Sequence, residues 1–186
     1  MFDYKNYKGF LDQTKDRSPL RDGSGRMRTQ SMFYEMSYHT RDTFTPLYSL
    51  RSDEVNGVSA YQIYMHSVDE TEAAYKLVGS LEHWRKLTSK NDNGNWTCPW
   101  LMEATGIAYH DGVVQWREDM RLRDEMFAKR KIMEAVEQGN VGAAKILLDS
   151  SKRVNKVGRP EGADLKRKND RVSDLVERGI GLSVVK

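Results

Sequence analysis

The stretch from Trp116 to Asp149 decides the fold that we predict, and it reads WREDMRLRDEMFAKRKIMEAVEQGNVGAAKILLD. Its apolar residues recur at steps of three or four positions, which places them on one face of a helix. Gly139 and Asn140 interrupt this pattern, because glycine ends a helix cheaply in the left-handed conformation and asparagine caps the next helix. The stretch therefore predicts a long helix, a two-residue break and a second, shorter helix.

The apolar stripe of this predicted helical hairpin needs a partner, because charged residues occupy the rest of its surface. One possible partner is a second copy of the chain. The other is the chain's own core, in which case the hairpin is an ordinary antiparallel helix pair. For the first alternative we predict an oligomerisation seam made by Trp116, Met120, Phe127, Met133, Val136, Leu147 and Leu148.

Length and composition limit the architecture. The chain has 186 residues, 38% hydrophobic and 31% charged, so we expect one domain with tails and a modest core. No apolar run approaches the ~18 residues that a membrane span needs, and we expect neither membrane association nor a secretion signal. The single cysteine, Cys98, excludes an internal disulfide, and with only four scattered histidines the sequence disfavours a structural zinc site.

Charge is distributed unevenly along the chain. Residues 1–50 carry eight basic and six acidic groups, a net charge of +2; residues 51–150 carry twelve and sixteen, a net charge of −4. Residues 151–186 carry ten basic and five acidic groups, a net charge of +5. An acidic middle with a basic end fits contact with a polyanion through the ends, and a solvated tail is the alternative.

Two features of the basic tail are typical of DNA contacts. Gly158-Arg159-Pro160 is similar to the short basic inserts that lie in an A·T-rich minor groove. Residues 163–178 predict a short amphipathic helix with a basic outer face, formed by Lys166, Arg167, Lys168 and Arg171. We list Arg159, Lys166, Arg167 and Lys168 as candidate DNA-binding residues.

Residues 69–88 form the clearest local motif. Asp69 is a candidate N-cap, Gly79 predicts a tight turn, and Ser80 can cap the helix that follows. A helix, a glycine turn and a short second helix is the plan of a helix-turn-helix, although such pairs are also common in all-α cores. The candidate DNA-binding residues here are Lys76, Arg85, Lys86 and Lys90, with His83 on the outside of the second helix. Residues 103–116 are a second, lower-ranked candidate pair.

The sequence on either side of this motif predicts no regular domain. Residues 1–58 hold several Gly and Pro residues and scattered aromatic residues, so we expect an arm, with an extended piece at 45–50 that covers the core. Ser59 can cap a helix that follows the arm. Residues 89–97, SKNDNGNWT, are expected to be a polar loop.

No catalytic signature is present. The sequence lacks GxxxxGK[ST], GxGxxG, HExxH, GxSxG and CxxC. Its carboxylates stand beside lysines and arginines, which favours solvated ion pairs over an acid–base dyad. We therefore expect a protein that is not an enzyme and that needs no cofactor.

Four stretches, taken in their order, resemble a bacteriophage terminase small subunit, the DNA-recognition part of a viral genome-packaging motor. They are DETEAAYKLVGSLEHWRKL at 69–87, VVQWREDM at 113–120, ILLD at 146–149 and KVGRPEGADLKRK at 156–168. The resemblance implies an α-helical protein without nuclease or ATPase activity. It also implies a ring of copies, binding to double-stranded viral DNA, and recruitment or regulation of the large terminase subunit, in the host cytoplasm and at the procapsid.

We therefore expect a mainly α fold in four parts. These are an N-terminal arm and extended segment (1–58), a helix-turn-helix-like DNA-binding domain (59–112), a helical hairpin for oligomerisation (113–150) and a basic C-terminal tail (151–186) that contacts the large subunit or DNA. Two alternatives stay open: a structural virion protein, such as a connector or internal component, and a dimeric helix-turn-helix transcriptional regulator.

Overall fold

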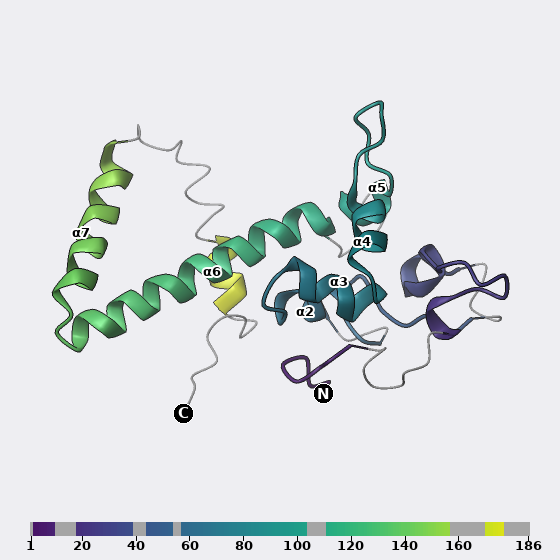
Figure 1. Ribbon diagram of the computed structural model, residues 1–186, viewed down its shortest axis with the longest axis horizontal. Helices are drawn as coiled ribbons and strands as arrows, with labels where there is room; N and C mark the ends of the chain where they lie inside the picture. The colour runs from purple at the N-terminus through teal and green to yellow at the C-terminus, as the bar shows by residue number, and fades with distance from the viewer. Residues whose placement is uncertain are drawn as a thin grey trace. The chain divides into compact units, whose positions relative to one another are not determined.

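The computed structural model describes residues 2–9, 18–38, 44–53, 57–103, 111–156 and 170–176 (Figure 1). For residues 18 and 150–156 it describes the backbone alone. The chain divides into two compact units, Met1–Arg117 and Glu118–Lys186. Over the described ranges the secondary structure is helical apart from isolated bridges, which confirms the prediction of a mainly α protein. No helix in these ranges is long and apolar enough to cross a membrane.

The helices of the first unit are short. They are the 3-10 helices η1 (Ser18–Leu20), η2 (Gln30–Met32) and η3 (Tyr34–Met36), and the α-helices α2 (Ala60–Met65), α3 (Glu70–Val78), α4 (Leu81–Thr88) and α5 (Pro99–Met102). α6 (Gly112–Glu137) begins in this unit and continues into the second, where α7 (Val141–Lys156) and a further helical segment, 170–176, follow.

Three helices of the first unit begin at the capping residues that the sequence predicted. The side-chain oxygens of Ser59, Asp69 and Ser80 each accept a hydrogen bond from a backbone N–H in the first turn of α2, α3 and α4. Gly79 ends α3 with φ 68°, a left-handed conformation that residues with a Cβ rarely adopt. The helix–glycine–helix plan of residues 69–88 is therefore confirmed as local structure.

Described residues among the first 58 belong to the core of the first unit, which corrects the expected arm. Leu20, Met32 and Phe33 are almost fully buried. The backbone N–H of Ser59 donates to the Tyr4 hydroxyl at 3.0 Å. The boundary that we predicted at residue 58 thus separates no compact units, because side chains from both sides of it share one core. The extended piece at 45–50 is confirmed, with bridges from Tyr48 to Phe33 and from Ser49 to Ser59.

Aromatic rings join the start of α6 to this core. The Trp116 ring centroid lies 5.8 Å from that of Tyr61 and 5.6 Å from that of Tyr64. Trp116 is 1% exposed, and Met120 is buried as well. Trp116 and Met120 are therefore removed from the predicted seam. Their own chain already covers the side chains that a second copy would need to touch.

The second unit contains the predicted break between two helices. Gly139 has φ 83°, and Asn140 Oδ1 accepts a hydrogen bond from the Ala143 N–H, as expected for a helix end and a new cap. α7 continues past the predicted end at Asp149 to Lys156. Figure 1 shows α6 and α7 diverging from the turn. They therefore do not pack along each other, as they would in the ordinary antiparallel helix pair that was one of our two alternatives.

The helical segment 170–176 returns to α6. Nε and Nη2 of Arg171 donate to the two carboxylate oxygens of Asp119 at 2.8 and 2.7 Å. Asp119 is fully buried, as is Leu175. This corrects the prediction that Arg171 lines the basic outer face of a helix, because its guanidinium pairs with the buried Asp119 carboxylate.

Candidate nucleic-acid interface

α4 has one buried face and one basic face. Trp84, Leu87 and Thr88 are buried, whereas Arg85 and Lys86 are exposed, as predicted. Lys86 Nζ lies 2.7 Å from Glu82 Oε1, and both side chains are more than two-thirds exposed. Such an exposed pair contributes little to stability, so Lys86 can exchange Glu82 for a phosphate at small cost. Within the described part of the chain, no carboxylate pairs with Arg85.

Glu70, the first residue of α3, fixes the position of α4. Its Oε1 accepts a hydrogen bond from Trp84 Nε1 at 2.8 Å and another from Arg117 Nη2 at 2.7 Å. Burial lowers the pKa of Arg117, but the hydrogen bond and charge of Glu70 outweigh this effect and leave that pKa raised. One carboxylate thus ties together α3, α4 and the start of α6. The sequence gives no sign of this role, because the long-range partners of Glu70 leave no local signal.

His83 lies inside the unit, which corrects its predicted place on the outer face of α4. The imidazole is half-buried, and its Nε2 lies 3.4 Å from the carbonyl oxygen of Arg28. Burial lowers the pKa of His83 below its ordinary value, because a charged imidazole is poorly solvated there. The exposed basic face of α4 is therefore formed by Arg85 and Lys86 without His83.

A tight hairpin follows α4 where we expected a polar loop. Lys90 and Trp96 form an antiparallel bridge. The Asn91 N–H donates to the Asn95 carbonyl at 2.8 Å, and the Gly94 N–H donates to the Asn91 carbonyl at 2.9 Å. Gly94 has φ 79°, as expected of the left-handed residue in a three-residue hairpin loop. The Asn-Gly pair at 93–94 was the signal that could have found this hairpin.

The hairpin sets the position of Lys90. The Lys90 ammonium lies 4.6 Å from the centroid of the Trp96 ring, a favourable cation–π distance. Trp96 is itself held, because its Nε1–H donates to Glu103 Oε1 at 2.6 Å. Lys90 is exposed, as a predicted DNA contact requires, and its side chain is oriented by the ring beneath it.

Lys76 is buried, in contrast to the other predicted basic contacts of this region. It is 7% exposed, and its Nζ lies 2.9 Å from Glu72 Oε1. The Lys76 carbonyl accepts a hydrogen bond from the Tyr48 hydroxyl at 3.2 Å. An ammonium that is enclosed and neutralised cannot reach a phosphate without rearrangement, so we remove Lys76 from the candidate interface.

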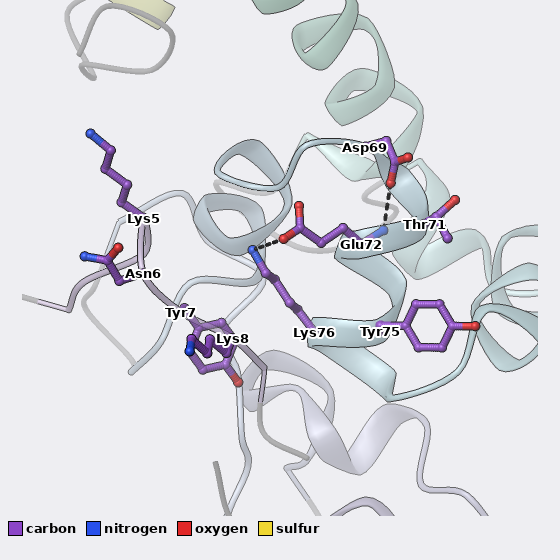
Figure 2. Close-up of a pocket in the computed structure, with 9 residues that line it drawn as sticks. All are labelled: Lys5, Asn6, Tyr7, Lys8, Asp69, Thr71, Glu72, Tyr75 and Lys76. Carbon is purple, nitrogen blue, oxygen red and sulfur yellow. Dashed lines mark hydrogen bonds and ion pairs between the residues drawn. The ribbon is translucent and has the colours of Figure 1, made fainter. Parts of the chain in front are cut away.

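A pocket of about 610 Å³ opens between the N-terminal segment and α3. Figure 2 shows its lining residues, which are Lys5, Asn6, Tyr7, Lys8, Asp69, Thr71, Glu72, Tyr75 and Lys76. Both carboxylates already have partners within α3: Asp69 Oδ1 accepts the Glu72 N–H, and Glu72 pairs with Lys76. The pocket thus presents capping groups and exposed lysines, and nothing in its geometry pairs a nucleophile with a base.

Apolar side chains are exposed on the second unit. Phe127 and Met133 on α6 are 54% and 53% exposed, and Leu148 on α7 is 61% exposed. Of the remaining seam residues, Val136 and Leu147 are half-exposed. Ile146 and Val141 on α7 are exposed as well. We had not listed these two residues in the seam, although both lie within the hairpin stretch.

Several predicted residues lie outside the described part of the chain. These are Arg159, Lys166, Arg167 and Lys168 in the basic tail, and residues 104–110 of the second helix-turn-helix candidate. In what is described of that candidate, Gly112 begins α6, and a Cβ built on it would lie 2.3 Å from the Met102 carbonyl oxygen. Across the described residues, no group of three His, Cys, Asp or Glu side chains could hold a metal ion.

Comparisons with protein-family models, with curated proteins and with solved structures each found no match to this chain.

Proposed function

We propose that this chain is a DNA-binding, self-assembling subunit of the terminase small-subunit type. In this role it binds double-stranded viral DNA at the start of packaging and recruits or regulates a large ATPase–nuclease subunit. The proposal rests on the order of the four resembling stretches together with two surfaces, the basic face of α4 and the exposed apolar side chains of α6 and α7.

The single observation that supports DNA binding most is the fixed exposure of Arg85 and Lys86. The capped pair α3–α4 and the Trp84–Glu70 hydrogen bond hold α4 in place, and its outer face then presents these two cations. The second helix of such a pair is the element that enters a major groove. Arg85 and Lys86 serve as phosphate contacts, which position a protein on a duplex without reading its sequence.

Assembly of several copies supplies the affinity for DNA that a single α3–α4 helix pair lacks. Two or three phosphate contacts bind weakly at physiological salt, because counterion screening reduces each one. Repeating the pair on several linked copies raises the effective concentration and adds roughly 10²–10⁴ in avidity. The exposed side chains of Phe127, Met133 and Leu148 are the surface through which copies join.

The test is DNA binding by the full chain and by a variant with Arg85→Ala and Lys86→Ala. We expect the variant to lose about tenfold or more in affinity for duplex DNA, since each lost phosphate contact removes its counterion release. Fluorescence anisotropy at two salt concentrations measures this loss, and circular dichroism checks the fold. Equal affinity of the two proteins at both salt concentrations would reject α4 as the DNA-binding element.

One alternative function is favoured by a specific observation. The exposed apolar surface of α6 and α7 suits a structural virion protein, such as a connector or internal component, whose helices only assemble. That function predicts an oligomer without affinity for DNA, and it predicts the chain in mature particles in stoichiometric amounts. A dimer that binds one DNA sequence would instead favour the transcriptional regulator.

A further inference from the structure

The hairpin of residues 89–97 continues α4 without a linker. Ser89 follows the last residue of α4, and its Oγ donates to the Lys86 carbonyl at 3.2 Å. The Thr97 N–H donates to the Ser89 carbonyl at 2.9 Å, which closes the base of the hairpin. In Figure 1 the hairpin extends from the end of α4 as a narrow projection. Its position is therefore set by the helix that precedes it.

The hairpin is held at both ends and along its length. Hydrogen bonds cross it at its base and next to its loop, and Asn91 Oδ1 accepts two further bonds, from the N–H groups of Asn93 and Asn95. Beyond the base, the Leu101 N–H donates to the Cys98 carbonyl as α5 begins. Such a brace preorganises the exposed side chains, so little conformational entropy is lost when they bind.

The exposed side chains of the hairpin include one cation, one carboxylate and several amides. Lys90, Asn93 and Asn95 are exposed. Amide and ammonium groups of this kind are the usual donors to phosphate and sugar oxygens. Asp92 is the single acidic residue of the segment SKNDNGNWT. Trp96 supports Lys90 from beneath and is itself only partly exposed, so the projection has no apolar tip that would suit a protein groove.

If α4 lies in a major groove, its length would bring the hairpin close to a phosphate strand. Eight residues of helix span about 12 Å, which matches the major groove width of about 12 Å. When α4 occupies the groove, an element joined to its C-terminal end emerges at the groove edge, where the sugar–phosphate backbone runs.

We propose that the 89–97 hairpin is a second DNA-contacting element, which grips the sugar–phosphate backbone of duplex DNA beside the groove that α4 enters, with Lys90 and Asn93 as its contacts. This inference rests on the proposed function and extends it. It assigns the hairpin a positioning role on the duplex, separate from any reading of bases by α4.

Three single variants of the full chain test the hairpin. Lys90→Met keeps an unbranched apolar stem over Trp96 but removes the charge, and Asn93→Ala removes an amide that makes no side-chain bond among the described residues. Asp92→Asn removes the acidic group from the same tip. Lys5→Met is the matched control, because it removes one exposed lysine charge elsewhere in the same unit.

Binding is measured by anisotropy with a duplex of about three helical turns, roughly 30 base pairs, across a series of salt concentrations. For Lys90→Met we expect a several-fold loss of affinity and a salt slope that is shallower by about 0.9 for each hairpin on the DNA. Asn93→Ala loses affinity without changing the slope, because no charge is removed. Asp92→Asn gains affinity, since it removes a charge that repels phosphate.

The outcomes separate this inference from the proposed function. If Arg85→Ala weakens binding while all three hairpin variants match wild type and Lys5→Met, then α4 binds DNA and the hairpin does not. If the wild-type protein binds no duplex at any salt concentration, both the hairpin contact and the proposed function are contradicted. Hydroxyl-radical footprinting gives a second readout: Lys90→Met should lose protection only on the backbone segments that the hairpins contact, and an unchanged footprint contradicts the hairpin contact.

Discussion

At the scale of single residues, long-range partners decide roles that sequence spacing leaves open. The Glu70 carboxylate accepts hydrogen bonds from Trp84 and Arg117, which are far from it in the sequence. Lys76 looked like one cation among several, but burial and Glu72 make it part of the core. Among the predicted basic contacts that the structure describes, Arg85, Lys86 and Lys90 are exposed, as the proposed contact with DNA requires.

We expect Glu70→Ala to lower the free energy of unfolding by about 1–2 kcal/mol, because it leaves the Trp84 N–H and the partly buried Arg117 guanidinium without their acceptor. Glu82→Ala is the control, since it removes only an exposed ion pair with Lys86, which contributes about 0–1 kcal/mol. Urea denaturation measures both. An equal loss in the two variants would show that Glu70 has no structural role beyond an exposed pair.

His83 gives the stability a pH dependence. Burial lowers the pKa of His83 in the folded protein, so the unfolded chain binds that proton more readily. Protonation of the unfolded state therefore destabilises the wild type as pH falls below the ordinary histidine pKa of about 6.5. We expect His83→Gln to narrow the difference in urea midpoint between pH 7.5 and pH 5.5. An unchanged difference would mean that His83 titrates alike in both states.

At the scale of elements, the sequence predicted what local chemistry controls. Asp69, Gly79 and Ser80 bound α3 and α4, and Gly139 and Asn140 separate α6 from α7, because caps and left-handed turns depend on a few adjacent residues. The hairpin at 89–97 was not predicted, since its polar composition resembles a loop and Asn93-Gly94 is its one local turn signal.

The helical segment 170–176 pairs with α6 through Arg171 and Asp119, and its Leu175 side chain is buried. We expect Arg171→Ala to remove the charged partner that lies 2.7 Å from the buried Asp119 carboxylate and to destabilise the second unit by about 3 kcal/mol. Limited proteolysis should then cleave this segment faster than in wild type. Ser173→Ala is the control, because Ser173 is exposed on the same segment. Cleavage of Arg171→Ala at the wild-type rate would show that the pair does not hold the segment on α6.

At the scale of the whole molecule, the sequence predicted helical content but not the division of the chain. The described part of the expected arm is not separate from the first unit, because Tyr4, Leu20 and Phe33 join a core whose other residues lie up to a hundred positions away. α6 crosses the boundary between the two units, so its stripe serves two purposes. Trp116 completes the first core, whereas Phe127 and Met133 remain exposed.

The seam on α6 and α7 can be tested by reversing its polarity. We expect Leu148→Asp to weaken self-association strongly without unfolding the chain. Leu148 is exposed within one copy, and an aspartate there would be buried between copies without a partner for its carboxylate. Lys145→Asp, also exposed on α7, is the control for a new acidic residue on the same helix. Sedimentation velocity at several concentrations compares the two.

The mass of the native protein tests most directly whether copies of this chain join through α6 and α7 before they bind DNA. Native mass spectrometry of the wild type should give a closed oligomer, at a whole multiple of the 21.5 kDa chain, that takes up duplex DNA as one assembly. Leu148→Asp should fall towards a single chain. A wild-type mass of 21.5 kDa, unchanged when duplex DNA is added, would contradict both the assembly and its function.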